Sequence, residues 1–508
     1  MEAAQPPDME MEEAAGPNPK KRRSDALATE KSPPPATVAA EAPNPQPTPT
    51  KMRSTNSQEP SPPGAGGDAG GGGVDRITGL PDAILGDIIS LLPTKDAART
   101  QTLASRWRHI WLSAPLNLDF GDLHADDESL AGVISRILSA HPGPGRRFCV
   151  PPQHLHDRPA TVDAWLRSPA LDKLQQLDFW EDRKYSRVRM FRPSPPPAST
   201  FRFSATLRVA TFCKCHLVDS SVEALHFPQL SQLALEEVNI SEGSLHTMIS
   251  SCPALECLLL NRNSGFGCVR INSNSLRSIG VGAKYFDTPQ FRELIIEDAP
   301  CLERLLNLQV DVGLFVSVIR APKLETLCCL TDPSGLVFGG TAIQGVHVVS
   351  LTTVMRSVKI LAINQQSINL DMVIDLIKCF PCLEKLYIKC CISGEKNLWR
   401  RKHRHLIKCL DIRLKTIVLE PYWGINSQVN FASFFVLNAR ELELMRLGVG
   451  SSNYNEVFFA KQHRMLQMEK RASRGARLDF KVKICPHNLL HINHVRDLSI
   501  TNPFECRY

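Results

Sequence analysis

Apolar anchor residues return at near-regular intervals along the centre of the chain. Six of them are separated by 23, 25, 21, 26 and 22 residues. These six are Leu207, Leu230, Leu255, Leu276, Leu302 and Leu324. Four more follow after wider gaps of 34, 25, 31 and 28 residues, at Val358, Leu383, Leu414 and Leu442. The spacing predicts a tandem array of supersecondary units, with insertions that lengthen the later copies.

The pattern inside one copy indicates a short strand followed by a turn. Leu255, Leu258 and Leu260 are followed by Asn263, which places apolar residues at positions 1, 4 and 6 and Asn at position 9. That is the frame of a leucine-rich repeat, and residues 383–391 fit it as well. Several copies also share a Pro-x-Leu-Glu opening. We therefore prefer a repeat solenoid to the alternative, an ordinary α/β domain with many short strands.

A different, helical periodicity precedes the array, between residues 80 and 111. The apolar positions of this stretch are Leu80, Ile84, Leu85, Ile88, Ile89, Leu92, Leu103, Trp107, Ile110 and Trp111. Pro81 suits the first turn of a helix, and Pro93 ends that helix while Thr94 can cap the next. The pattern predicts three short helices with more large apolar side chains than so small a bundle can bury. Surplus apolar surface on a small module indicates that a partner covers it.

Residues 1–74 have the composition of a disordered tail. They contain 14 Pro and 8 Gly but no Phe, Trp or Tyr, so they cannot bury enough apolar surface to offset the entropy of ordering. The tail carries four adjacent cations, Lys20, Lys21, Arg22 and Arg23. This cluster resembles a monopartite nuclear localisation signal; the alternative is a chance basic run. We expect the protein in the nucleus, the cytoplasm or both.

Composition and charge exclude several classes of protein. The net charge of +7 on 508 residues is too small to argue for nucleic-acid binding. Basic stretches at 400–405 and 470–477 are as well explained by a solvated loop and a solvated helix face. No apolar run approaches the ~18–20 residues that a membrane span requires. Sixteen cysteines without a secretory signal predict free thiols in a reducing compartment.

No catalytic or cofactor motif stands out. The chain has no phosphate-binding loop, zincin motif or nucleophile elbow. Cys379, Cys382, Cys390 and Cys391 could in number form a zinc site, but the repeat frame explains them better. We expect no catalytic residue, no cofactor and no metal.

The helical stretch resembles an F-box of the plant type in three separated blocks. The matching residues are Leu80-Pro81, Ile84-Leu85, Ile88, Leu91-Leu92-Pro93, Thr94-Lys95-Asp96-Ala97, Leu103, Ser105-Arg106-Trp107-Arg108 and Trp111. The departure is Ala104, where a larger residue is often seen. The Pro-x-Leu-Glu copies resemble the repeats of plant F-box/leucine-rich repeat proteins. Residues 429–442 resemble the start of the so-called FBD region, and residues 470–473 together with 494–504 resemble its end.

This resemblance, joined to the periodicity, implies an α/β protein in four parts. A small three-helix F-box at 75–120 follows the disordered tail at 1–74. An irregular leucine-rich repeat solenoid at 121–425 and an FBD-like region at 426–508 complete the chain. The solenoid exposes a parallel sheet on its concave side as a binding face, with Glu236, Leu259, Tyr387 and Lys389 on it.

The resemblance further implies a non-catalytic, substrate-recognition subunit of an SCF-type (Skp–cullin–F-box) ubiquitin ligase. The F-box would dock a Skp-family adaptor and, through it, a cullin, while the repeats hold an unknown target protein. The expected adaptor contacts are Leu80, Pro81, Ile84, Leu85, Ile88, Leu92, Pro93, Leu103 and Trp107. The alternatives are a nuclear DNA-binding protein, which would place Arg106, Arg108 and His109 in a groove, and a repeat scaffold not linked to ubiquitination.

Overall fold

A computed structural model describes most of the chain after residue 76. The described residues are 77, 79–123, 127–181, 193–283, 291–309, 313–331, 334–365, 367, 369–390, 397–399, 411–482 and 490–504. The chain separates into two units, Met1–Val74 and Asp75–Tyr508. The predicted disordered tail with Lys20, Lys21, Arg22 and Arg23, and the basic stretch at 400–405, lie outside the described residues.

Three short helices open the second unit, as the apolar pattern predicts. They are α1 (Asp82–Ile89), α2 (Thr94–Arg99) and α3 (Ser105–Ser113), with the 3-10 turn η1 (Thr100–Thr102) between the last two. Pro81 and Pro93 stand directly before α1 and α2, where a missing N–H costs no helical hydrogen bond. The module closes over its own core of Leu85, Ile89, Ala97, Ile110 and Ala114.

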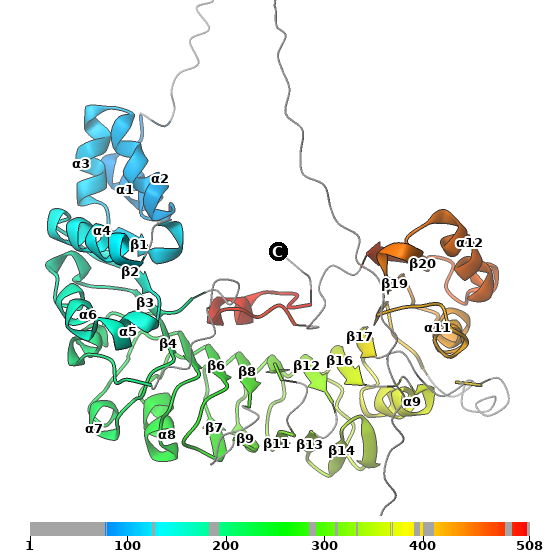
Figure 1. The fold of residues 1–508 in the computed structure, drawn as a ribbon. Helices are drawn as coiled ribbons and strands as arrows, with labels where there is room; N and C mark the ends of the chain where they lie inside the picture. The colour runs from blue at the N-terminus through cyan, green and yellow to red at the C-terminus, as the bar shows by residue number, and fades with distance from the viewer. Residues whose placement is uncertain are drawn as a thin grey trace, which may run out of the picture. The chain divides into compact units, whose positions relative to one another are not determined.

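A 14-stranded sheet runs through the rest of the unit, and every neighbouring pair in it is parallel (Figure 1). Its strands, in spatial order, are β1 (Leu116–Asp119), β2 (Gly145–Val150), β3 (Gln176–Phe179), β4 (Val209–Cys213), β5 (Gln232–Glu236), β6 (Cys257–Asn261), β8 (Ser278–Gly282), β10 (Arg304–Asn307), β12 (Thr326–Leu330), β16 (Ile360–Gln365), β17 (Lys385–Cys390), β18 (Thr416–Glu420), β19 (Leu444–Val449) and β20 (Arg477–Val482). Each of the ten anchors from Leu207 to Leu442 is buried and lies two residues before its strand. The solenoid predicted from the anchors is confirmed.

The register of the sheet follows from the repeat frame. Leu233 in β5 pairs with Leu258 in β6, which pairs with Ile279 in β8. The same position continues as an apolar ladder through Leu386 of β17 to Ile417 of β18. Successive side chains of a strand point to opposite faces of the sheet. The residues of this ladder therefore all face the same side, where they form one continuous core.

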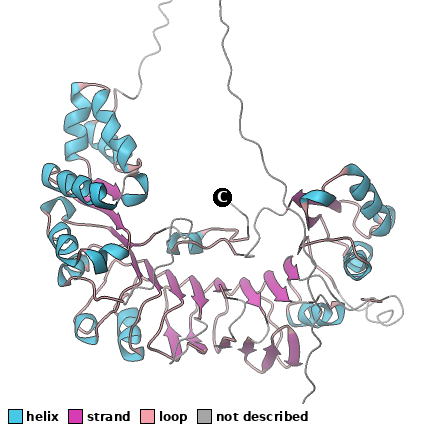
Figure 2. Ribbon diagram, in the orientation of Figure 1, coloured by secondary structure: helices cyan, strands magenta, loops and turns pink. Residues whose placement is uncertain are grey.

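Helices cover one face of the large sheet towards its two ends (Figure 2). They are α4 (Asp127–Ala140), α5 (Gln153–Asp157), α6 (Pro159–Leu166), α7 (Asp219–Val222), α8 (Glu242–Ser250), α9 (Leu370–Cys379), α11 (Asn426–Asn438) and α12 (Glu456–Met465). Short 3-10 turns are η2 (Phe120–Asp122), η3 (Pro169–Leu171), η4 (Ala198–Phe203), η5 (Ser451–Asn453), η6 (Met468–Lys470) and η7 (Val495–Ser499). None of the helices in the described ranges has both the length and the apolarity needed to traverse a bilayer.

Between α8 and α9 a second sheet takes the place of the helices. It contains β7 (Cys268–Asn272), β9 (Glu293–Asp298), β11 (Phe315–Val318), β13 (Gly335–Phe338), β14 (Thr341–Gln344) and β15 (His347–Ser350). The first four strands are parallel, whereas β13, β14 and β15 form an antiparallel meander. The meander accounts for the wide gap between Leu324 and Val358, which the sequence shows as an insertion.

The FBD-like region continues the solenoid. β19 and β20 extend the parallel ladder, since Leu419 of β18 pairs with Leu447 of β19 and Leu447 with Phe480 of β20. The last described stretch, residues 490–504, leaves this frame and packs on the opposite face of the sheet, where η7 lies against β5, β6 and β8 (Figure 1).

Candidate docking surface

The three-helix module exposes an apolar ridge. Helix α1 carries two apolar stripes, and each contains residues four positions apart. Leu85 and Ile89 face the core, whereas Ile84 and Ile88 face outward with 48% and 43% of their surface exposed. Leu103, in the turn before α3, is 66% exposed. Pro81 and Pro93, which directly precede α1 and α2, are exposed as well.

Leu85 is the one expected adaptor contact that is fully buried. Its side chain is 0% exposed and belongs to the core of the module, so it shapes the bundle and cannot touch a partner. Leu80, Leu92 and Trp107 are half-buried and pack against the same core, which leaves each of them a partial outer surface.

Two further apolar side chains of the module are exposed although they were not among the expected contacts. Leu91 is 64% exposed and Ile77 is 58% exposed. Leu91 stands within the Leu-Leu-Pro block of the F-box resemblance, so the sequence contained a signal for it. Ile77 precedes the motif, and no signal marks it.

An arginine fixes the edge of the ridge. Nε of Arg106 donates to Oδ1 of Asp82 at 2.8 Å, and a second guanidinium nitrogen donates to the backbone oxygen of Leu80 at 2.6 Å. These bonds tie α3 to the start of α1. They also engage a side chain that the DNA-binding interpretation would place in a groove.

The module is joined to the first strand of the sheet by side-chain hydrogen bonds. The hydroxyl of Thr94 donates to the backbone oxygen of Asn117 and accepts the N–H of Asp119, while Asn117 donates back to the oxygen of Leu92. Since β1 begins the strand order of the sheet, these groups cover a sheet edge that would otherwise offer free backbone groups. The position of the ridge is thereby set by the solenoid.

The inner face of the sheet, expected to be the open binding face, is covered over much of its length. Leu259 and Tyr387 are buried in a cluster with residues 490–498 of the same chain. Glu236 is buried as well, and its carboxylate accepts a hydrogen bond from Asn261 at 3.1 Å. Lys389 remains half-exposed. The expectation of an open inner face at Glu236, Leu259 and Tyr387 is therefore wrong.

The described cysteines are buried or half-buried free thiols. Burial raises the pKa of Cys215 to about 12 and that of Cys252, Cys257 and Cys379 to about 11, which keeps these thiols protonated. Within the described ranges, no three metal-ligating side chains lie close enough together to hold an ion. Cys391, the fourth member of the possible zinc set, lies outside those ranges.

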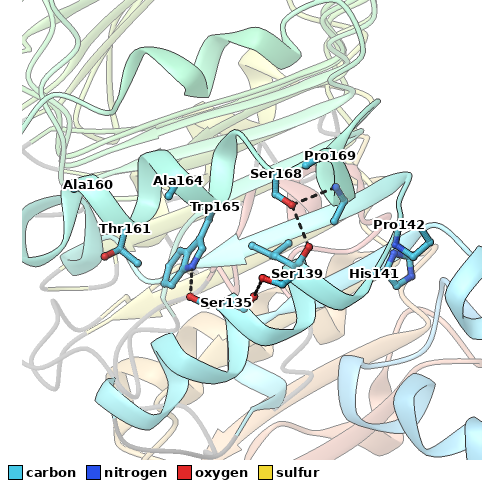
Figure 3. Close-up of a pocket in the computed structure, with 12 residues that line it drawn as sticks. Ser135, Ser139, His141, Pro142, Ala160, Thr161, Ala164, Trp165, Ser168 and Pro169 are labelled. Atoms are coloured by element: carbon cyan, nitrogen blue, oxygen red, sulfur yellow. Dashed lines mark hydrogen bonds between the residues drawn. The ribbon is translucent and has the colours of Figure 1, made fainter.

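An open hollow lies between α4 and α6 (Figure 3). Two of its polar side chains form hydrogen bonds within the protein: the indole N–H of Trp165 donates to Ser135 at 2.8 Å, and the hydroxyl of Ser168 donates to the backbone oxygen of Leu138 at 3.2 Å. Ligand pockets usually present convergent polar groups to the ligand, and this hollow presents small side chains instead. It adds no second candidate site.

Comparisons with known proteins agree with this architecture. Residues 77–119 match the F-box domain, residues 162–388 match the LRR repeats of an FBD-associated F-box protein, and residues 402–447 match the FBD. The FBD match begins before residue 426, the boundary expected from the sequence.

Curated relatives of the chain include proteins of Arabidopsis thaliana. A putative F-box/FBD/LRR-repeat protein is 30% identical over 246 residues, which are 46% of this chain and 48% of the relative. The chain thus spans about half the length of that relative, and 58% of a putative F-box protein that is 26% identical. Two F-box/FBD/LRR-repeat proteins, 24% and 25% identical, are covered over 94% and 96% of their length by 80% and 82% of this chain. The chain thus carries an F-box, leucine-rich repeats and an FBD, one after another, and is similar to F-box/FBD/LRR-repeat proteins; the F-box and the leucine-rich repeats are protein-interaction domains.

Proposed function

We propose that the chain is the substrate-recognition subunit of an SCF-type ubiquitin ligase. The F-box docks a Skp-family adaptor and so joins a cullin, and the solenoid binds a target protein. The chain contributes binding and no catalytic step of its own.

The observation that supports this proposal is the ridge of Ile84, Ile88 and Leu103, together with the exposed side chain of Leu91. These side chains stay exposed although the module around them already has a closed core. Full burial of an exposed Leu or Ile side chain contributes about 1.5–3 kcal/mol, and part of this gain is open to each of these four half-exposed side chains, which favours a partner that buries them. Trp107 and Leu92 are half-buried and keep a partial outer surface that a partner can also cover.

The test is capture of a purified Skp-family adaptor by the full chain. We expect wild type to capture the adaptor and Ile84→Glu/Ile88→Glu to lose capture by more than about tenfold, because two carboxylates would be desolvated at the interface. This pair separates loss of binding from loss of folding better than Leu80→Ala/Pro81→Ala does, because Leu80 also packs against the core of the module.

The matched control is Val457→Glu, which makes the same kind of change on α12 at a side chain that is 81% exposed. It should leave capture unchanged. Failure of the intact chain to capture any adaptor, or equal capture by the Ile84/Ile88 variant, would overturn the proposal.

We also propose that Lys20, Lys21, Arg22 and Arg23 direct part of the protein to the nucleus. A fluorescent fusion with all four changed to Ala should show a smaller nuclear share than wild type. Lys51→Ala/Arg53→Ala removes charge from the same tail and serves as the control. An unchanged distribution in the fourfold variant would contradict this proposal.

A further inference from the structure

The chain's own C-terminal segment, residues 490–504, occupies the inner face of the sheet. In Figure 1 it lies within the span of the strands, against the face that carries no helices. Its η7 turn packs on β5, β6 and β8, which precede it by more than 200 residues in the sequence. It adds no strand to the sheet, so it is held chiefly by its side chains.

Apolar side chains of this segment cover an apolar stripe of the sheet. Val495 and Leu498 are fully buried, and Leu490 and Ile492 are nearly so. The stripe beneath them consists of Val209, Ala234, Cys257, Leu259, Leu306, Cys328, Ala362, Tyr387 and Val418. Inner-face positions of a repeat array normally face solvent or a partner. A row of apolar side chains there is stabilised when another segment covers it and excludes water.

The sheet is shaped to receive Leu498. A Cβ atom on Gly280 of β8 would come within 2.9 Å of Cδ2 of Leu498 and 3.1 Å of Cδ1 of Leu259. The missing side chain at residue 280 is thus the hollow into which Leu498 fits.

A buried carboxylate anchors the polar side of the segment. Asp178 of β3 is fully buried, and it accepts contacts from Nε2 of His494 and a guanidinium nitrogen of Arg496, both at 3.3 Å. The same nitrogen of Arg496 donates to Gln176 at 2.6 Å. Burial alone would raise the pKa of Asp178, but His494, Arg147 and Arg496 together hold this pKa well below its ordinary value. The anchor is therefore a fixed negative charge that selects a basic occupant.

The far end of the segment is held by an aromatic contact. The ring of Phe504 stacks on Tyr387 of β17, with centroids 4.1 Å apart and planes 19° apart. Between the two ends, Arg304 of β10 donates to the backbone oxygen of Ile500 at 3.1 Å.

The segment also organises itself. Asp497 accepts the backbone N–H groups of Asn493 and His494, and His494 in turn caps the start of η7. A compact turn that carries its own capping and docks by side chains has the features of a bound peptide ligand.

We propose that the inner face from β3 to β17 is a peptide-binding surface, which residues 490–504 occupy within the chain and which a target segment of the same chemistry can occupy in their place. Such a segment carries a His-x-Arg pair for Asp178 and apolar side chains two residues after it for the hollow at Gly280. The inference rests on the proposed function, because it assigns target binding to the solenoid. A tethered segment competes at an effective concentration of about millimolar, so only a target of comparable fit displaces it.

The test uses the full chain with a specific protease site placed within residues 483–489. Cleavage leaves residues 490–508 bound without a covalent link. A fluorescein-labelled synthetic peptide of residues 490–504 is then added, and its binding is followed by fluorescence anisotropy. We expect the cleaved chain to take up the peptide and the uncleaved chain to bind it at least tenfold more weakly.

Matched variants test the chemistry of the anchor. The peptide with His494→Ala/Arg496→Ala should bind the cleaved chain at least tenfold more weakly, and so should the wild-type peptide to a cleaved Asp178→Asn chain. Asp172→Asn makes the same change at an exposed carboxylate that pairs with Arg202 outside this surface and should bind as wild type does.

Three results would overturn the proposal. The cleaved chain could keep its own fragment against an excess of peptide, it could lose cooperative unfolding once cut, or it could bind the substituted peptide as well as the wild-type one. Adaptor capture by the same cleaved chain is measured in parallel, because capture without peptide exchange would leave the proposed function intact and remove only this inference.

Discussion

The hydroxyl of Thr94, at the start of α2, donates a hydrogen bond of 3.0 Å to the backbone oxygen of Asn117 in the first strand of the sheet. The same hydroxyl accepts the N–H of Asp119 at 2.8 Å, and Thr94 is buried. A single side chain therefore satisfies two backbone groups at the sheet edge and fixes the three-helix module to the solenoid.

Thr94→Val should lower the free energy of unfolding by about 1–3 kcal/mol, because the near-isosteric change leaves a part-buried N–H and a part-buried carbonyl without their partner. Urea unfolding measures the change. Thr102→Val is the control, since the hydroxyl of Thr102 is exposed and bonds only to Arg99 of its own turn. Equal effects of the two substitutions would contradict a special role for Thr94.

The junction should also weaken in mild acid. Gly143 donates its N–H to Nδ1 of His141, so the proton of His141 sits on Nε2 and is donated to the backbone oxygen of Trp111 at 3.1 Å. Burial lowers the pKa of His141, although the bond to Trp111 opposes the shift. The folded state thus favours neutral His141. Its contribution is complete above the unfolded pKa of ~6.5 and is lost as the pH falls below that value.

The check is thermal unfolding at pH 7.5 and pH 5.5. The melting temperature of wild type should fall more over this interval than that of His141→Gln, in which no imidazole titrates at this position. The other histidines are common to both proteins and cancel in the comparison. Parallel pH dependences would show that His141 does not titrate at the junction.

The repeats of the solenoid could be predicted from the sequence because a large aliphatic residue, nearly always Leu, recurs at the same position before each strand. Anchors such as Leu255 and Leu383 lie at a buried position two residues before each strand, and their recurrence can still be recognised where insertions lengthen a repeat. Helical spacing likewise located α1. It could not separate Ile84 from Leu85, because an apolar residue on either stripe of a two-sided helix gives the same pattern.

The second sheet and the covered inner face were not readable in this way. Strands such as Cys268–Asn272 have the short apolar texture of the main array, so nothing in the sequence shows that they pair among themselves. The bond between His494 and Asp178 joins residues 316 positions apart. The C-terminal stretch could be recognised in the sequence as an FBD-like motif. Nothing in the motif indicates which residues of the sheet it packs against, so the covered face could not be predicted.

Native thiols should react slowly with alkylating reagents. Burial raises the pKa of Cys215 to about 12, against an ordinary value near 9. At pH 7.5 this leaves much less of the thiolate than an exposed cysteine has, and the thiolate is the reactive form. Cysteine-resolved mass spectrometry after brief iodoacetamide treatment should find Cys215 unmodified in the folded protein and modified after urea denaturation. Rapid native labelling would show that this part of the core opens readily.

Two glycine-to-alanine changes should have opposite effects. Gly280→Ala places a methyl group 2.9 Å from Leu498 and 3.1 Å from Leu259, and overpacking of this kind costs about 1–3 kcal/mol. Gly132 lies in α4, and a Cβ there meets no atom within 4 Å, so Gly132→Ala should stabilise the fold by about 0.5–1 kcal/mol through helix propensity. Urea unfolding of both variants measures the difference. If Gly280→Ala were neutral, Leu498 would have room to move aside, and the hollow at residue 280 would not define the position of the C-terminal segment.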